Sequence, residues 1–526
     1  MGVHNILGTL RRALQLKHPQ ALGKLGVAFI CSQNDVVELE ILYARTLRLM
    51  GYRCVFLMRS GSKKKDISIV RRYGFSVVFL EDVGYSCIAS NNIPVVNQLL
   101  EQAEREGPLD IEYKGISLGR YAAATVLRKT RGSSIQLANQ KDRELYDYYF
   151  RHAFQACEVA ADLDEEYRPQ LVLFCDRVYV PGGVLFEYFV KNGIQCITHN
   201  AAQLTGFHVL KRYLSIKEVR SHPHSLSDRS WQYLCNRVWR EQDWAQLKSS
   251  IKDAYLEGDW FAEVGTQFGK KIVHKDVLRK KLGLDESRKT VCVFPHMFWD
   301  GTFGYGTDLF TDYHDWFVNV LRCAGANDSL NWLVKIHPAN TVKAKRDGVV
   351  VDHSEILAIR DVLGETPNHI TVIHSDDDVS TYSLFSVIDY ALTVRGTVGI
   401  EAAAFGVRTL TAGTGRFDGR GFTLDFDDVK DYKSTLMNLS EVKAMSIAEI
   451  DLARRYAYGV FLCRLIDTTS VLSDVIQHDD LATREVKMIV KSEKMLAKSL
   501  FYDEFQRYVL SNSVDYLRDS VLDTAL

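Results

Sequence analysis

Residues 389–423 constrain the fold more than any other part of the chain. They predict a strand, a tight turn, a short helix, a second strand and a glycine-rich loop in succession. The turn from Arg395 to Gly399 opens the helix, whose unpaired backbone N–H groups and partial positive charge favour a bound phosphate. Glu401, on the first helical turn, could accept hydrogen bonds from sugar hydroxyls. An ordinary strand–helix–strand unit, whose glycines only serve turns, fits the segment equally well.

Alternating strand and helix patterns extend this interpretation to most of the chain. The expected strands of the first half are 25–32, 52–58, 75–80, 170–175 and 194–198, and those of the second half are 290–294, 332–336, 370–373, 387–394 and 407–412. Such alternation is typical of parallel sheets covered by helices on both faces. We therefore predict an α/β fold with two Rossmann-like domains facing a cleft, where ligands bind at the carboxyl ends of strands.

The domain boundaries follow from where the alternation stops. We expect an N-terminal Rossmann-like domain at 1–220 and a second one at 289–470, joined by a helical connector at 221–288 and followed by C-terminal helices at 471–526. Four tryptophans fall in the connector, at Trp231, Trp239, Trp244 and Trp260, and we expect them to pack it against the domains.

Composition excludes several classes of protein. A net charge of -1 argues against a nucleic-acid partner. Ten scattered cysteines without a CxxC pair argue against a cysteine zinc site and indicate a reduced, cytoplasmic protein.

No apolar run is long enough to span a bilayer. Residues 6–16 could form a basic amphipathic helix at the inner face of the cytoplasmic membrane, or simply an N-terminal helix.

No cofactor is predicted. No metal is predicted either, because the acidic run 375–378 is better explained as a helix cap. The oligomeric state is left open.

Polar residues end several predicted strands of the second domain. His337 and Pro338 follow one strand, with Lys335 two residues earlier on the same face, and a histidine there can donate a hydrogen bond to a phosphate. A lone histidine at a strand end is more often structural, but the Gly396 turn would border the same cleft. His296 and Asp300 belong to the loop after the first strand of this domain.

Three arginines, Arg395, Arg416 and Arg420, surround the glycine-rich turns and could bind phosphate or carboxylate. Salt bridges with Asp418 or Asp425 are an equally good explanation for any one of them.

The first domain offers candidates for a general base in transfer to a hydroxyl group. Asp176 ends a predicted strand and is preferred, since the following turn leads into a helix near the cleft. Asp35 follows the first strand but could simply cap its helix, and His199 ends another strand.

The motifs WLVKIHP, RGTVGIEAAAFG and GRFDGRGFT, with PHMFWDG and EYKGISLGRYAAATVLRKTRG, resemble the bacterial capsule polysaccharide biosynthesis family. This family includes glycosyltransferases related to the Kdo-adding capsule enzymes. The resemblance covers scattered motifs between residues 110 and 425. It implies a GT-B fold and transfer of a sugar from a nucleotide donor, often a CMP-linked ulosonic acid, to a glycan or lipid-linked acceptor in surface polysaccharide biosynthesis.

Carried over by motif, the resemblance implies that His337 and Thr397 contact the donor phosphate and that Glu401 binds ribose or the nucleotide sugar. The expected donor-binding residues are Lys335, His337, Pro338, Arg395, Gly396, Thr397, Val398, Gly399, Glu401 and Arg420, with Asp176 and His337 as catalytic residues. The chain departs from the family at Arg395 and Gly396, where a serine is usual, and lacks a clear first-domain acidic motif. Two alternatives stay open: a non-hydrolysing nucleotide-sugar 2-epimerase, and a non-catalytic nucleotide- or glycan-binding assembly protein.

Overall fold

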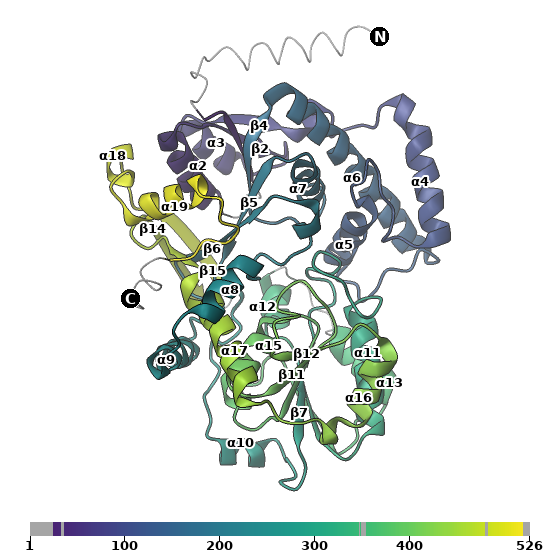
Figure 1. The fold of residues 1–526 in the computed structure, drawn as a ribbon. Coiled ribbons are helices and arrows are strands. Elements are labelled where there is room, and N and C mark those ends of the chain that lie inside the picture. The colour runs from purple at the N-terminus through teal and green to yellow at the C-terminus, as the bar shows by residue number, and fades with distance from the viewer. Residues whose placement is uncertain (1–24, 33–35, 347, 349–353, 479–481, 519–526) are drawn as a thin grey trace.

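The computed structural model describes residues 25–32, 36–346, 348, 354–478 and 482–518. The N-terminal domain lies at the top of Figure 1 and the second domain below it. Asp35 and the expected helix at 6–16 fall outside the described residues. Among the described residues, no helix combines the length and apolarity needed to cross a membrane.

The first sheet has the strand order of a Rossmann fold. Its strands are β1 (Val27–Cys31), β2 (Arg53–Met58), β3 (Ser76–Phe79), β4 (Pro169–Phe174), β5 (Gln195–Ala201) and β6 (Phe207–Tyr213). They are ordered 3-2-1-4-5-6, with β1 to β5 parallel and β6 antiparallel to β5.

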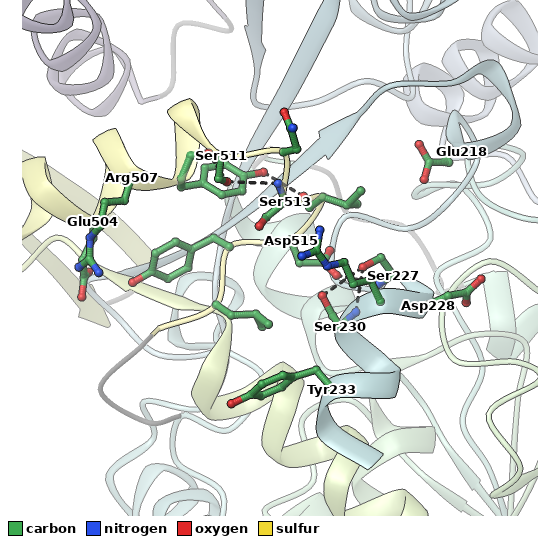
Figure 2. A pocket seen from close by; sticks show the side chains of 16 residues that line it. Glu218, Ser227, Asp228, Ser230, Tyr233, Glu504, Arg507, Ser511, Ser513 and Asp515 are labelled. Carbon is green, nitrogen blue, oxygen red and sulfur yellow. Dashed lines mark hydrogen bonds between the residues drawn. The ribbon is translucent and has the colours of Figure 1, made fainter. Parts of the chain in front are cut away.

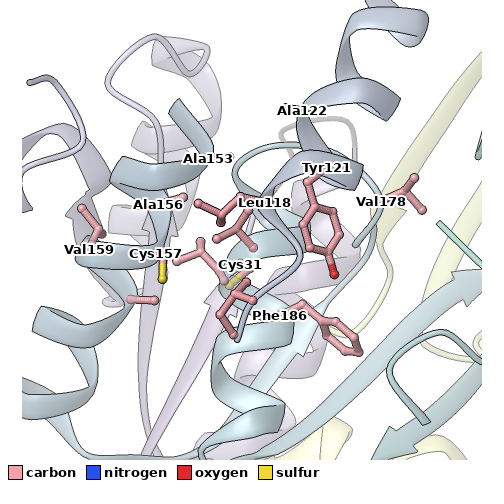
Figure 3. Close-up of a cluster of buried hydrophobic side chains, with 14 of the residues drawn as sticks. Cys31, Leu118, Tyr121, Ala122, Ala153, Ala156, Cys157, Val159, Val178 and Phe186 are labelled. Atoms are coloured by element: carbon pink, nitrogen blue, oxygen red, sulfur yellow. The ribbon is translucent and has the colours of Figure 1, made fainter. Parts of the chain in front are cut away.

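Helices cover both faces of this sheet because its strands are apolar on both sides. The helices are α2 (Val37–Met50), α3 (Lys64–Arg72), α4 (Ile93–Glu106), α5 (Leu118–Thr130), α6 (Gln140–Tyr167) and α7 (Gly182–Lys191). In β1, Phe29 and Cys31 pack towards α5, α6 and α7, whereas Ala28 and Ile30 pack towards α2. Figure 3 shows Cys31 among side chains of α5, α6 and α7.

The second sheet repeats the same order with every strand parallel. Its strands are β7 (Thr290–Val293), β8 (Asn331–Lys335), β9 (Ile370–Ile373), β10 (Tyr390–Thr393), β11 (Arg408–Thr411) and β12 (Thr423–Asp425). The flanking helices are α11 (Tyr313–Ala326), α12 (Ala339–Arg346), α13 (Ser354–Leu363), α14 (Thr381–Leu384), α15 (Thr397–Ala404), α16 (Val429–Met437) and α17 (Ile447–Tyr458). The predicted GT-B-like fold of two Rossmann-like domains is confirmed.

The connector is helical, as expected, and comprises α8 (Asp228–Asn236), α9 (Glu241–Glu257) and α10 (Lys275–Lys281). Aromatic contacts hold it to the second domain. The ring of Trp231 lies 5.5 Å from that of Tyr456 on α17, and the ring of Trp244 lies 5.3 Å from that of Phe405 after α15.

The C-terminal part departs from the expectation of helices from residue 471. β13 (Leu465–Asp467) joins the first sheet beside β6, and a hairpin of β14 (Leu472–His478) and β15 (Ala482–Met488) follows. Only then come α18 (Glu493–Leu496) and α19 (Leu500–Leu510), with α19 packed against α2. The chain therefore returns to the N-terminal domain before residue 470. Along β15, Arg484, Val486 and Met488 are less exposed than Thr483, Glu485 and Lys487, and this alternation has the period of a strand.

Arg212 on β6 holds this returning segment in place. Its Nη1 donates to the carbonyl oxygens of Ser511 (2.5 Å) and Ser513 (2.9 Å), and its Nη2 donates to that of Tyr508 (2.7 Å).

The substitution Arg212→Lys replaces the planar guanidinium group, which bonds to these carbonyl oxygens, with a single ammonium group. We therefore expect the free energy of unfolding to fall by about 2–3 kcal/mol in urea denaturation. Arg143→Lys, at a half-exposed side chain, is the control. Equal midpoints for the two variants would contradict this role.

Candidate functional site

A cavity of about 170 Å³ lies where the strand order of the second sheet reverses, between β7 and β10. Parallel α/β sheets bind ligands at this point, because the loops after the two central strands diverge there. Pro295 and His296 follow β7 and Gly396 follows β10, and all three line the cavity.

The cavity brings together most of the candidates named from the sequence of the second domain. Its wall contains Lys335, His337, Pro338, His296, Gly396, Thr397, Val398 and Glu401. The end of β8 and the start of α15, separated by about sixty residues of chain, therefore face the same space.

His337 presents a hydrogen-bond donor. Its Nδ1 accepts the backbone N–H of Ala339 at 3.2 Å. Burial, followed by the charge of Lys343, lowers the pKa of His337 to about 4, so the ring is neutral at pH 7. With Nδ1 occupied as an acceptor, the proton resides on Nε2. His337 therefore offers an N–H group rather than a charge.

His296 has a different task. Its Nε2 accepts the backbone N–H of Arg395 at 3.2 Å, and its ring stacks on Tyr313 with the centroids 4.5 Å apart. This bond ties the loop after β7 to the turn before α15. We conclude that His296 positions the turn.

The start of α15 adds further donors. Gly396 is the N-cap residue and no side chain caps this helix in the described structure; the N–H of Gly399 donates to the Gly396 carbonyl oxygen at 2.9 Å, which leaves the N–H groups of Thr397 and Val398 without a helical acceptor. The Thr397 hydroxyl accepts from Arg416 Nη2 at 2.5 Å. Burial and the neighbouring Lys270 lower the pKa of Lys335 to about 8, which leaves it largely protonated at pH 7. This end of the cavity suits an anion.

Glu401 closes the cavity on the connector side. The Tyr255 hydroxyl donates to Glu401 Oε2 at 2.5 Å, and Glu401 is only 2% exposed. Burial raises the pKa of Glu401 to about 7, so near neutral pH the carboxyl group is about half protonated.

Two arginines expected at the donor do not line the cavity. Arg395 forms an ion pair with Asp308 (2.6 Å) and donates to the Tyr313 hydroxyl (2.9 Å). Arg420 pairs with Asp228 at 2.7 Å. Both side chains hold neighbouring loops through ion pairs, although their partners are not Asp418 or Asp425, which accept backbone N–H groups of the glycine-rich loop.

Gly399 also serves packing. A Cβ atom at this position would lie 2.8 Å from the Phe417 ring. The glycine is required for the close approach of α15 to the glycine-rich loop.

Two of the candidate carboxylates, Asp300 and Asp176, lie near the boundary between the domains. Asp300, in the loop after β7, accepts from Tyr179 Oη (3.0 Å) and Arg128 (3.2 Å) of the first domain and from Lys343 (2.5 Å) of the second. Burial alone would raise its pKa, but Lys343 and Arg128 lower the pKa of Asp300 to about 2. Asp300 thus links α12, which begins directly after His337 and Pro338, to Tyr179, three residues after Asp176.

Asp176 follows β4, at the point where the strand order of the first sheet reverses. Its Oδ1 accepts the N–H of Val178 at 2.9 Å. Burial raises its pKa, and the charge of Asp300 adds to the shift. Asp176 is thus a stronger base than an ordinary aspartate.

His199 is not a cleft residue. β5 continues to Ala201, so His199 lies inside a strand that pairs with β6. Its ring is 1% exposed and lies 4.9 Å from that of Tyr43, and burial lowers its pKa to about 3. The expectation failed because the strand is three residues longer than its apolar run.

The connector supplies a wall that sequence reasoning missed. Its lining residues are Tyr255, Trp260, Phe261, Val264, Thr266 and Gln267. The available signal was the gathering of aromatic residues there, which we attributed to packing alone.

A larger cavity, about 510 Å³, lies between α8 and the segment around α19 (Figure 2). Its polar groups bond within the chain: Asp515, for example, accepts the backbone N–H of Ser227 at 2.7 Å. None of the site residues proposed from the sequence lines this larger cavity.

No protein-family model and no curated protein matches the chain. Solved structures similar to it include a Thermosulfurimonas dismutans KpsC β-Kdo 2,4 transferase, with 12% identity and a TM-score of 0.33 over 54% of this chain and 79% of that one. A UDP-GlcNAc 2-epimerase from Neisseria meningitidis has 9% identity and a TM-score of 0.27 over 83% and 96%. MurG of Acinetobacter baumannii has 8% identity and a TM-score of 0.27 over 82% and 94%.

The raised pKa of Glu401 predicts a pH-dependent stability. Between pH 4.5 and about 7 the folded state binds more protons here than the unfolded state, so stability falls as pH rises. The substitution Glu401→Gln removes the ionisable group, so the variant does not lose stability here as pH rises, and the amide oxygen still accepts the hydrogen bond from Tyr255. We expect the variant to exceed the wild type in free energy of unfolding by about 1–3 kcal/mol at pH 8, and by less at pH 5.

Glu449 provides a control of opposite sign. The hydrogen bonds from Arg408 lower its pKa to about 2, so Glu449→Gln should destabilise the protein at pH 8. Urea denaturation of both variants at the two pH values gives the comparison. A Glu401→Gln variant that is less stable than the wild type at pH 8 would refute the assignment.

Proposed function

We propose that the protein is a glycosyltransferase that moves a sugar from a nucleotide-activated donor to a glycan or glycolipid acceptor in surface polysaccharide biosynthesis. The observation that supports this most is the cavity at the β7–β10 crossing, which combines the start of α15, His337 and Lys335. A base candidate, Asp176, occupies the corresponding crossing of the first sheet. We place the reaction in the cytoplasm, at the inner face of the membrane when the acceptor is lipid-linked.

The donor phosphate binds at the polar end of the cavity. The N–H groups of Thr397 and Val398, the Nε2–H of His337 and the ammonium of Lys335 stabilise the charge that develops on the leaving phosphate. The helix start and His337 are fixed before the ligand arrives, because His296 holds the turn, Arg416 holds Thr397, and Ala339 holds the His337 ring. A CMP-linked ulosonic acid is one donor of this class.

The acceptor approaches from the first domain. Its hydroxyl oxygen forms the new bond to the anomeric carbon, the donor phosphate leaves with the electron pair, and Asp176 takes the hydroxyl proton. Asp300 stays ionised and joins Tyr179 and Arg128 to Lys343 across the domain boundary, which holds the closed arrangement and excludes water.

Nucleotide binding is the first test. In a thermal-shift screen of CMP, CDP, UDP and GDP, we expect at least one to raise the melting temperature through binding to the native state. His337→Ala should weaken that nucleotide about tenfold or more, because it removes one hydrogen bond to a charged group. His274→Ala, at an exposed side chain, is the control. If none of the four nucleotides shifts melting at millimolar concentration, the proposal fails.

Catalysis is tested at Asp176. With the matching nucleotide sugar, Asp176→Asn should bind the donor normally but release nucleotide about 10²–10⁴-fold more slowly, because the general base is lost. Release is followed by a coupled assay and the sugar product by NMR. An epimerised nucleotide sugar, formed without acceptor, would instead identify a 2-epimerase. Tight binding with no turnover in either form would identify a binding protein.

A further inference from the structure

The cavity has two chemically different ends. His337, Lys335 and the start of α15 form the polar end described above. The connector forms another part of the wall, to which Tyr255, Trp260 and Phe261 contribute aromatic side chains and where Tyr255 bonds to Glu401.

Of these three rings, that of Phe261 has surface to offer a ligand. Trp260 is 1% exposed and lies between Tyr255 and Phe461, with ring centroids at 5.5 and 5.0 Å. Tyr255 is 2% exposed and is bonded to Glu401. Phe261 is only partly buried and rests with its edge against Trp260 at 5.7 Å.

The backbone holds Phe261 in an unusual conformation. Its φ and ψ are 54° and 41°, in the left-handed region that is unfavourable for an aromatic residue. Its N–H donates to the carbonyl oxygen of Gln203 at 2.9 Å, and its carbonyl oxygen accepts the N–H of Val264 at 3.1 Å. Contacts with the first domain and within the connector thus fix a ring in the cavity wall that local preference would not place there.

We propose that Phe261 is the stacking face for the nucleobase of the donor, an inference that rests on the proposed function. His337 lies directly before α12, whose Lys343 bonds to Asp300, and Asp300 bonds in turn to Tyr179, three residues after Asp176. The transferred sugar therefore lies on the side of His337, and the wall formed by the connector is left for the base. Every nucleobase has a flat π-face that stacks on an aromatic side chain, and such stacking tolerates different bases.

The test separates the base from the rest of the nucleotide. Isothermal titration calorimetry compares ribose 5-phosphate with whichever of CMP, CDP, UDP and GDP the wild type binds most tightly. Phe261→Gly removes the ring and suits the left-handed backbone, so it should not disturb the fold. Phe261→Tyr keeps a ring, and Phe268→Leu alters an exposed aromatic residue of the connector that does not line the cavity.

We expect Phe261→Gly to bind the nucleotide about tenfold or more weakly while its affinity for ribose 5-phosphate is unchanged. Phe261→Tyr and Phe268→Leu should bind both ligands like the wild type. Unchanged nucleotide affinity in Phe261→Gly would overturn the stacking assignment while leaving the proposed function intact. An equal loss for both ligands would also overturn it, since the ring would then contact the sugar or support the fold. A wild type that binds none of the nucleotides would overturn the proposed function itself.

Discussion

The unpaired amide groups at the start of α15 are the feature on which the site depends. Because Gly396 provides no side-chain cap for α15, the N–H groups of Thr397 and Val398 need an acceptor from outside the helix, and an anion satisfies that need. Much of the surroundings holds this helix start in place. His296 binds the preceding turn, Arg416 binds Thr397, and the ion pair of Arg395 with Asp308 braces the loop. Neither Arg395 nor Arg416 lines the cavity, and both arginines hold parts of its surroundings in place.

Neutral polar groups contribute more to the electrostatics of the cavity than charged side chains do. His337 is neutral at pH 7, Glu401 is about half protonated, and Lys335 is the cationic side chain of the polar end. A site of this kind can bind a phosphate without a heavy desolvation cost, because few full charges must lose water. The strongly ionised carboxylate, Asp300, lies instead at the domain boundary, where cations from both domains compensate it.

The sequence predicted what local patterning controls. Apolar runs of strand length located both sheets, and the polar residues that follow β8 and β10 share a cavity because parallel strands end at one edge. It could not predict what depends on distant partners. Arg395 pairs with Asp308, 87 positions away, and the partner of Arg420, Asp228, comes from the connector. His199 was misplaced because β5 extends beyond its apolar run. The β14–β15 hairpin was missed because the helical pattern of α19 dominated the tail. The gathering of aromatic residues in the connector did not single out Phe261, because its place in the cavity wall depends on a left-handed backbone conformation that tertiary contacts impose.

The most direct test of the central claim is a crystal structure of the protein with a bound nucleotide. The account predicts a phosphate within hydrogen-bond distance of the Thr397 or Val398 amide and of His337 Nε2, in the cavity between β7 and β10. A nucleotide bound elsewhere, for example between α8 and α19, with the α15 amides facing only water, would contradict it.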